Sequence, residues 1–256
     1  MPPPLAHELH EPAVDVSDDR ADLLPVVLTH GFGGTLRMWD PTWPALAAAG
    51  HRVLTWDLPG HGRSDWGSDP ATYTLDAVLD AWEDLLDRSG IDRACIGGLS
   101  LGGQLALAFR NRRPERVATL VLADTGPGFR DPDARAKWNR GVEFRARLIE
   151  TKGFGALGKE AGVGLDRHLD PQGLVLAARG YLEQRDSSMI DRLGEIDVPT
   201  LVLVGSEDRH FLAATDYLAR KIRGARKVVV DGAGHVANLD RPEAFNDALL
   251  GFLASR

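Results

Sequence analysis

Short apolar runs alternate with amphipathic segments along most of this chain. The runs are rich in Val, Leu and Ile, a pattern typical of strands buried inside a parallel sheet. A polar and acidic segment precedes them through about Leu23, and one short edge strand is expected within it around residues 5–11. The predicted buried strands are residues 25–30, 53–57, 94–99, 117–123, 200–205 and 227–231.

The segments between these runs have helical periodicity. Thr74 can cap a helix that extends through Leu86 and has its apolar side chains on one face. Strands that alternate with helices form βαβ units and therefore a parallel sheet. The expected fold class is α/β, with a mostly parallel central sheet and helices on both of its faces. The other predicted helices of this alternation are residues 101–112, 211–222 and 242–253.

The alternation stops between Thr125 and Ile196, where no strand is predicted. Ligands of open α/β sheets bind beyond the carboxyl ends of the strands, so an insertion here would lie over the site as a lid. We therefore predict a core domain of residues 1–124 and 197–256 and a helical cap of residues 125–196. Helical patterns within the cap occur at residues 134–151, 154–163, 173–184 and 187–193.

Composition and charge narrow the class of protein. A hydrophobic fraction of 43% and a charged fraction of 26% are ordinary for a soluble globular protein. The single cysteine, Cys95, allows no intrachain disulfide, and the net charge of −7 argues against a nucleic-acid binder. No stretch approaches the ~20 apolar residues of a membrane span, and the N-terminus does not have the pattern of a secretory signal. A cytoplasmic protein that does not bind membranes is expected.

One turn carries a candidate nucleophile. The sequence Gly98-Leu99-Ser100-Leu101-Gly102 lies between a predicted strand and a predicted helix. A sharp turn from strand to helix crowds the serine, and small residues two positions to either side relieve the crowding. The N-terminus of the helix also favours negative charge that develops on the serine oxygen. Ser100 is therefore the predicted nucleophile.

A second glycine-rich turn, His30-Gly31-Phe32-Gly33-Gly34, follows the first buried strand. Acyl transfer passes through an oxyanion that needs two preorganised hydrogen-bond donors. We expect these donors to be the backbone N–H of Leu101, next to the nucleophile, and that of Phe32. A phosphate cradle is less consistent with the sequence, because no Lys follows the glycines at the spacing of a phosphate-binding loop.

A serine nucleophile needs a histidine as its base and a carboxylate to orient that histidine. His235 directly follows the last predicted strand, and Asp208 follows the strand before it, which gives the chain order Ser, acid, His. The predicted catalytic residues are therefore Ser100, Asp208 and His235. Asp124 and Glu207 are the alternatives for the acid, and His168 is expected to be a surface or structural residue.

These stretches, together with residues 57–64, resemble the α/β-hydrolase superfamily in its cap-bearing esterase and lactonase branch. The resemblance extends from about Pro25 to the C-terminus. It implies that residues 57–64 form a supporting turn, and that Ser100 attacks an ester, thioester or lactone carbonyl to give an acyl-serine that water then releases. Relatives with dehalogenase or epoxide hydrolase activity have an aspartate nucleophile, so Ser100 argues against both reactions.

The cap is expected to select the substrate. The predicted substrate contacts are Gly31, Trp138, Phe144 and Val236, and Arg135, Arg140, Arg145 and Arg147 are candidates to meet a substrate carboxylate. No cofactor is expected, and no cluster of histidines and carboxylates has the spacing of a metal site. The expected partner is a small ester or lactone rather than nucleic acid or a membrane, and a homodimer is left open.

Two other functions fit the same residues. The first is hydrolysis of a carbon–carbon bond, or a lyase reaction, on a dicarbonyl acid by the same three catalytic residues. The second is a receptor that keeps the triad but has little turnover, since a fold alone does not define a function. Activity on a ring-cleavage dienone acid but not on esters would favour the first, and ligand-dependent thermal shifts with near-zero turnover the second.

Overall fold

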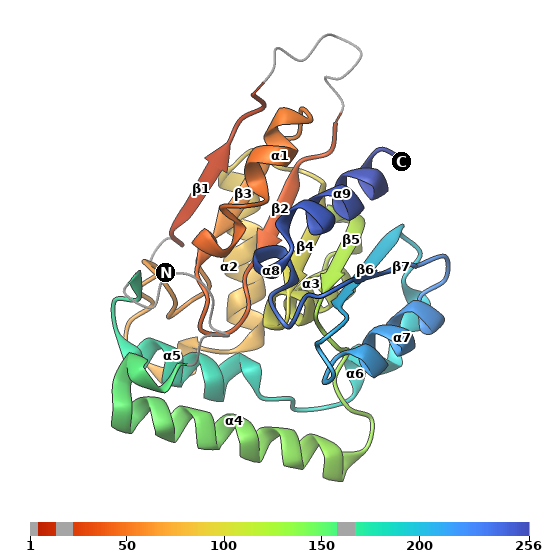
Figure 1. Cartoon of the computed structure of the whole chain (residues 1–256). Coiled ribbons are helices and arrows are strands. Elements are labelled where there is room, and N and C mark those ends of the chain that lie inside the picture. Colours follow the sequence, from red (N-terminus) through yellow and green to blue (C-terminus); the bar gives the residue numbers. More distant parts are fainter. Residues whose placement is uncertain (1–4, 14–22, 158–166, 256) are drawn as a thin grey trace.

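The structure is a computed structural model that describes residues 5–13, 23–157 and 167–255. It contains a seven-stranded sheet in the order β1-β3-β2-β4-β5-β6-β7 (Figure 1). Strand β1 is antiparallel to β3, and all other neighbouring strands are parallel. The predicted α/β class, the edge strand and the six further strands are confirmed, and five of these six are fully buried. Strand β7 was also predicted to be buried, but it lies at the edge of the sheet and is exposed over most of its length. The strands are β1 (His7–His10), β2 (Val26–Thr29), β3 (Val53–Trp56), β4 (Ala94–Leu99), β5 (Val117–Ala123), β6 (Thr200–Gly205) and β7 (Arg226–Val230).

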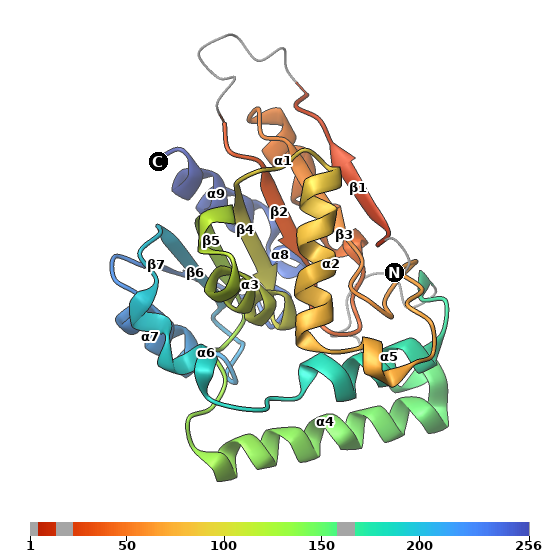
Figure 2. The same ribbon diagram turned by 180° about the vertical axis from the view of Figure 1, so that it is seen from behind.

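Both faces of the sheet are covered by helices. In β2 the side chains of Val26 and Leu28 pack into one apolar cluster, and Val27 packs into the other, because successive side chains of a strand point to opposite faces. Helices α1 and α9 cover the first face, and α2, α3 and α7 cover the second (Figures 1 and 2). The bounds of these helices are α1 (Trp43–Ala48), α2 (Leu75–Arg88), α3 (Leu101–Arg112), α7 (Leu212–Lys221) and α9 (Pro242–Leu253).

The predicted cap of Thr74 is confirmed, since its Oγ1 accepts a hydrogen bond from Ala77 N–H at 3.2 Å. The segment between β5 and β6 is helical in its described part, with α4 (Pro132–Lys152), α5 (Pro171–Ala177) and α6 (Ser188–Asp191). Within this segment α4 and α5 lie across the end of the sheet at which the parallel strands finish (Figures 1 and 2).

The predicted helix at residues 154–163 is described only in its first part, where Gly153–Ala156 forms a single 3-10 turn. Residues 158–163 lie outside the described residues. The division of the chain into a core domain and a cap domain stays a prediction.

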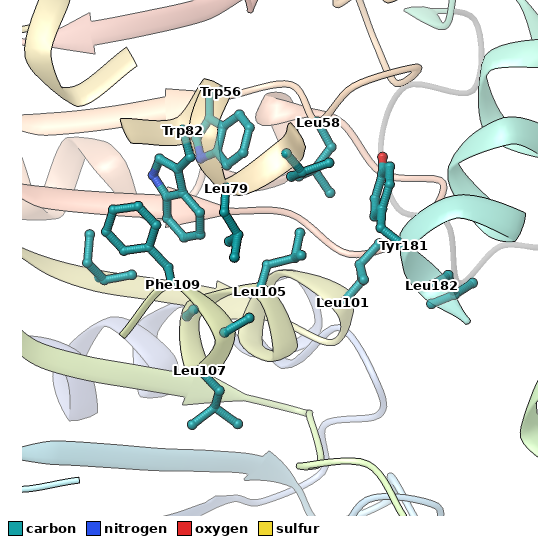
Figure 3. Packing of buried hydrophobic residues seen from close by; sticks show 14 of the residues in the cluster. Trp56, Leu58, Leu79, Trp82, Leu101, Leu105, Leu107, Phe109, Tyr181 and Leu182 are labelled. Atoms are coloured by element: carbon teal, nitrogen blue, oxygen red, sulfur yellow. The ribbon is translucent and has the colours of Figure 1, made fainter. Parts of the chain in front are cut away.

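The inserted segment shares its apolar core with the sheet. Tyr181 and Leu182 pack into the same cluster as Leu58 and Leu101 (Figure 3). The Tyr181 hydroxyl also donates a hydrogen bond to the carbonyl oxygen of Pro59 at 2.6 Å. The insertion is therefore attached to the core next to the nucleophile turn. Within the described ranges, no helix combines the length and the apolar character needed to cross a membrane.

Candidate active site

The turn between β4 and α3 holds Ser100 in a conformation that L residues rarely adopt, with φ 54° and ψ −115°. Close backbone contacts on both sides produce this turn. A Cβ on Gly98 would lie 2.2 Å from the carbonyl carbon of Gly102, and a Cβ on Gly102 would lie 2.1 Å from Thr29 O. Only glycine fits at both positions. The strand, turn and helix expected around Ser100 are all present.

Ser100, His235 and Asp208 meet at the carboxyl ends of β4, β6 and β7. Ser100 Oγ lies 3.0 Å from His235 Nε2, and His235 Nδ1 lies 2.8 Å from Asp208 Oδ2. Because a carboxylate only accepts hydrogen bonds, Nδ1 carries the ring proton and Nε2 is the acceptor for the serine hydroxyl. The three predicted catalytic residues therefore form one continuous hydrogen-bonded chain.

Neighbouring groups hold the acid and the base in place. The Asp208 side chain is 3% exposed and the His235 side chain 24% exposed. The ring of Phe211 stacks on the His235 ring, with centroids 5.0 Å apart. Glu207, an alternative for the acid, has an exposed side chain. The structure thus brings Asp208 rather than Glu207 to the imidazole.

The loop after β2 lies against the nucleophile turn. A Cβ on Gly31 would lie 3.3 Å from Ser100 Cβ, so the two backbones are in contact. The ring of His30 anchors this loop through two hydrogen bonds. Its Nε2 accepts one from Leu58 N–H at 3.0 Å, and its Nδ1 donates one to Gly31 O at 2.7 Å. In the described part of the chain, neither Phe32 N–H nor Leu101 N–H donates to a protein acceptor. Both predicted oxyanion donors are therefore available to a ligand.

Residues 57–64 form the supporting turn that the resemblance implies. Asp57 is buried, and its carboxylate accepts hydrogen bonds from Leu36 N–H at 2.7 Å and from Arg63 N–H at 2.9 Å. Ser64 Oγ donates back to Asp57 O at 2.7 Å. Asp57 therefore stabilises the loop that follows β2 and does not contact the three candidate catalytic residues.

The four predicted substrate contacts have different positions. Gly31 and Val236 are next to the candidate catalytic residues in space or in sequence. Trp138 Nε1 donates to Leu182 O at 3.1 Å and so joins two parts of the insertion. Phe144 is 69% exposed, and the structure does not bring it to the site. The buried face of α4 consists of Val142, Ala146 and Ile149, and Phe144 lies on a different face of the helix.

The candidate arginines of α4 differ in the groups that they contact. Arg147 pairs with Glu143, and Arg135 donates to Phe129 O. Arg145 instead lies over the ring of Phe32, with its guanidinium carbon 5.8 Å from the ring centroid. It is the arginine of this set that reaches the loop beside Ser100.

One residue of the site was not predicted to have a role there. His168 is 6% exposed, and its Nδ1 accepts a hydrogen bond from Gly62 N–H at 2.9 Å. Its Nε2 therefore carries the ring proton and donates to Gly33 O, 2.9 Å away. His168 lies between two predicted helices, and a lone histidine there has no periodicity or motif that would indicate this contact. Across residues 5–13, 23–157 and 167–255, His, Cys, Asp and Glu form no group that could hold a metal ion.

This fold is that of the α/β-hydrolases, and it places a hydrogen-bonded serine, histidine and aspartate at the carboxyl ends of its parallel strands. The chain belongs to the alpha/beta hydrolase family, whose sequence model matches residues 26–248.

Relatives of this chain have different named activities. It is 32% identical to the pimeloyl-(acyl-carrier protein) methyl ester esterase of Aromatoleum aromaticum, over 88% of this chain and 95% of that protein. It is 31% identical to the non-heme chloroperoxidase of Streptomyces lividans, over 91% of this chain and 93% of that protein. Among solved structures, the enol-lactonase of Burkholderia xenovorans LB400 is similar, with a TM-score of 0.73, 27% identity and coverage of 98% of this chain and 96% of that one.

Proposed function

We propose that this protein hydrolyses a small carboxylic ester or lactone through an acyl-enzyme intermediate on Ser100. The observation that carries the proposal is the hydrogen-bonded chain from Ser100 Oγ through His235 to Asp208, with distances of 3.0 and 2.8 Å. The similarity to a methyl ester esterase and to an enol-lactonase supports this substrate class.

In this mechanism His235 Nε2 takes the hydroxyl proton of Ser100 as Oγ attacks the substrate carbonyl carbon. Asp208 stabilises the imidazolium that forms. The N–H groups of Phe32 and Leu101 donate to the oxyanion of the tetrahedral intermediate. His235 then gives its proton to the leaving alkoxide, and the carbon–oxygen bond breaks to leave acyl-Ser100. Water, deprotonated by His235, attacks the acyl carbon and releases the carboxylic acid from Ser100.

The test is a panel of p-nitrophenyl esters and lactones, assayed with the wild type and with Ser100→Ala. We expect Ser100→Ala to remove turnover, and a fluorophosphonate probe to modify Ser100 in the wild type. Ser68→Ala, a change at an exposed serine outside the triad, is the matched control and should be labelled as the wild type is. Folded wild-type protein whose Ser100 does not react with the probe would contradict the proposal.

A second candidate is cleavage of a carbon–carbon bond in a dicarbonyl acid by the same three residues. Arg145 favours it, because its guanidinium lies over Phe32 beside the site. Glu143 on the same helix pairs with Arg179 and Arg147, whose hydrogen bonds lower the pKa of Glu143 to about 2. In the described ranges Arg145 forms no ion pair, so its charge is available to a substrate carboxylate.

The two candidates differ in what Arg145 should do. If the substrate has a carboxylate, Arg145→Gln should raise KM for an acidic ester, such as a succinate monoester, roughly tenfold relative to a neutral ester of the same size. Arg140→Gln on the same helix is the control, and it should leave KM unchanged for both the acidic and the neutral ester. An equal KM change for acidic and neutral esters would remove the support for a carboxylate substrate.

A further inference from the structure

Asp124 is a buried carboxylate at the end of β5 that the mechanism above does not use. It is 0% exposed and has a φ of 46°, and in the described chain only Ser100 shares a positive φ among residues other than glycine. Its Oδ1 accepts a hydrogen bond from Gly205 N–H at 2.8 Å, and its Oδ2 accepts one from Ala237 N–H at 3.4 Å. A buried charge in a strained backbone conformation is costly and suggests a function.

The two partners of Asp124 lie on the loops that carry the acid and the base. Gly205 ends β6 three residues before Asp208. Ala237 begins α8 (Ala237–Asp240) two residues after His235. One carboxylate therefore contacts both loops between which the His235–Asp208 hydrogen bond forms.

The neighbours of Asp124 in sequence contact the nucleophile. Ser100 N–H donates to the carbonyl oxygen of Ala123 at 2.9 Å. The hydroxyl of Thr125 donates to the carbonyl oxygen of Ser100 at 2.6 Å. Residues 123–125 thus contact the turn of the nucleophile, the loop of the acid and the loop of the base.

We propose that Asp124 is a positioning residue whose ionised carboxylate holds the loops of Asp208 and His235 so that their side chains meet, and whose protonation releases the base loop. This proposal rests on the proposed function. The reason for a carboxylate is the two N–H donors that face it. An amide would accept one hydrogen bond and turn its own NH₂ group against the other donor. A proton on Oδ2 would likewise oppose Ala237 N–H.

The surroundings of Asp124 make this protonation relevant near neutral pH. Burial raises the pKa of Asp124 to about 7, and repulsion from Asp208 acts in the same direction. The hydrogen bond from Gly205, the charge of His235 and the hydrogen bond from Ala237 favour the ionised form. The mechanism needs the unprotonated imidazole of His235 as base, and the positioning role needs the ionised carboxylate of Asp124, so activity should require the loss of two protons.

The test measures how fast a fluorophosphonate probe modifies Ser100 as a function of pH, which requires an active triad but no knowledge of the substrate. In the wild type the logarithm of this rate should fall below pH 7 with a slope that approaches two. In Asp124→Asn the slope should be one, and the rate at pH 8 should be about tenfold lower because one buried N–H loses its acceptor. Asparagine tolerates the positive φ, so the variant should fold.

The matched control is Asp57→Asn, which changes another buried carboxylate that accepts two backbone hydrogen bonds but does not contact the triad loops. The rate of Asp57→Asn should fall, because Asp57 stabilises the loop that carries Phe32, but its dependence on pH should stay as steep as in the wild type. A slope of one in the wild type, or an unchanged steep slope in Asp124→Asn, would overturn the proposal. The wild-type slope provides this test even if the variant does not fold. A wild type that is not labelled at any pH would instead contradict the proposed function.

A double-mutant cycle distinguishes positioning from a separate structural effect. If Asp124 acts by aligning Asp208 with His235, its substitution should cost less once Asp208 is already Asn. The double variant should then label Ser100 several-fold faster than the product of the two single losses predicts. Losses that multiply without interaction would show that Asp124 acts independently of the pair.

Discussion

The ring of His168 in the inserted segment donates a hydrogen bond from Nε2 to the carbonyl oxygen of Gly33, 2.9 Å away, and so ties the insertion to the loop beside Ser100. The same ring accepts a hydrogen bond from Gly62 N–H. One buried side chain therefore joins the insertion, the loop of Phe32 and the supporting turn at residues 57–64.

Loss of this contact should affect catalysis as well as stability. His168→Ala leaves Gly62 N–H and Gly33 O without their partner, which should cost about 1–3 kcal/mol of the free energy of unfolding. We also expect kcat to fall, because the loop that positions Phe32 N–H loses an anchor. Steady-state kinetics and chemical denaturation measure the two effects.

A buried histidine elsewhere provides the control for His168. His51 is also 6% exposed, and its Nδ1 donates to the carbonyl oxygen of Leu24. His51 precedes the amino end of β3, whereas Ser100 follows the carboxyl end of β4, so the two residues lie at opposite ends of the parallel strands. His51→Ala should lower stability and leave kcat unchanged. Equal kcat values for the His168 and His51 variants would argue against a role of His168 in the site.

The buried histidines should make the protein sensitive to acid. Desolvation lowers the pKa of His30 from 6.5 to about 4, and it lowers the pKa values of His61 and His168 as well. Below pH 6.5 the unfolded chain binds protons that the folded chain does not. Stability present above this pH is therefore lost as the pH falls through the folded pKa values, and His30 alone contributes about 3 kcal/mol. Melting temperatures measured from pH 7 to pH 4 should decline, and a flat profile would contradict neutral buried histidines.

Asp124 should act on stability in the opposite direction. Its folded pKa of about 7 lies above the ordinary value of 3.8, so its contribution is present at low pH and is lost as the pH rises toward 7. The difference amounts to about 4 kcal/mol between the two ends of this window. The melting temperature of Asp124→Asn relative to the wild type should therefore rise from pH 4 to pH 7. A constant difference would mean that Asp124 does not titrate in this window.

Substitutions of Asp208 and of its neighbour Glu207, one of the alternatives for the acid, should have different effects. Asp208→Asn removes the carboxylate that fixes the tautomer of His235, and kcat should fall by roughly 10² to 10⁴. Glu207→Gln changes an exposed side chain and should have little effect. Steady-state kinetics of the two variants at pH 8 decide between these residues. A larger loss of kcat for Glu207→Gln would show that Glu207, and not Asp208, is the acid.

The nucleophile turn should not tolerate a single methyl group. Gly102→Ala would place a Cβ 2.1 Å from Thr29 O, so we expect it to prevent folding or to displace Ser100. Gly251 in α9 is exposed, and a Cβ at this position would point into open space, so Gly251→Ala should stabilise the protein by about 0.5–1 kcal/mol. Circular dichroism and probe labelling compare the two. An active Gly102→Ala variant would contradict the packing of this turn.

Most of the fold was predictable because it depends on local patterns. Buried strands such as β5 are continuous apolar runs, and α2 has both a capping threonine and an apolar face. The candidate triad was predictable because Ser100, Asp208 and His235 each follow a strand that had already been identified. In a parallel sheet the carboxyl ends of the strands lie at one edge, so their loops meet there.

The insertion was predicted less well, since helical periodicity indicates a helix but not which flank of it meets the core. Phe144 is an aromatic residue that was predicted to contact the substrate, but its side chain is exposed. Arg145, the next residue, lies over the ring of Phe32. One residue along a helix rotates a side chain by about 100°. The orientation of α4 against the core therefore decides which of the two reaches the site.

The sequence by itself determined the order of the chemistry-bearing turns along the chain and the candidate serine, acid and base, because each depends on residues close together in sequence. Only the tertiary structure decided the contacts of His168 and Asp124. Both are defined by hydrogen bonds to backbone groups 81 to 135 residues away. A backbone N–H or C=O is the same at every residue, so no sequence pattern can indicate which of them a distant side chain will meet.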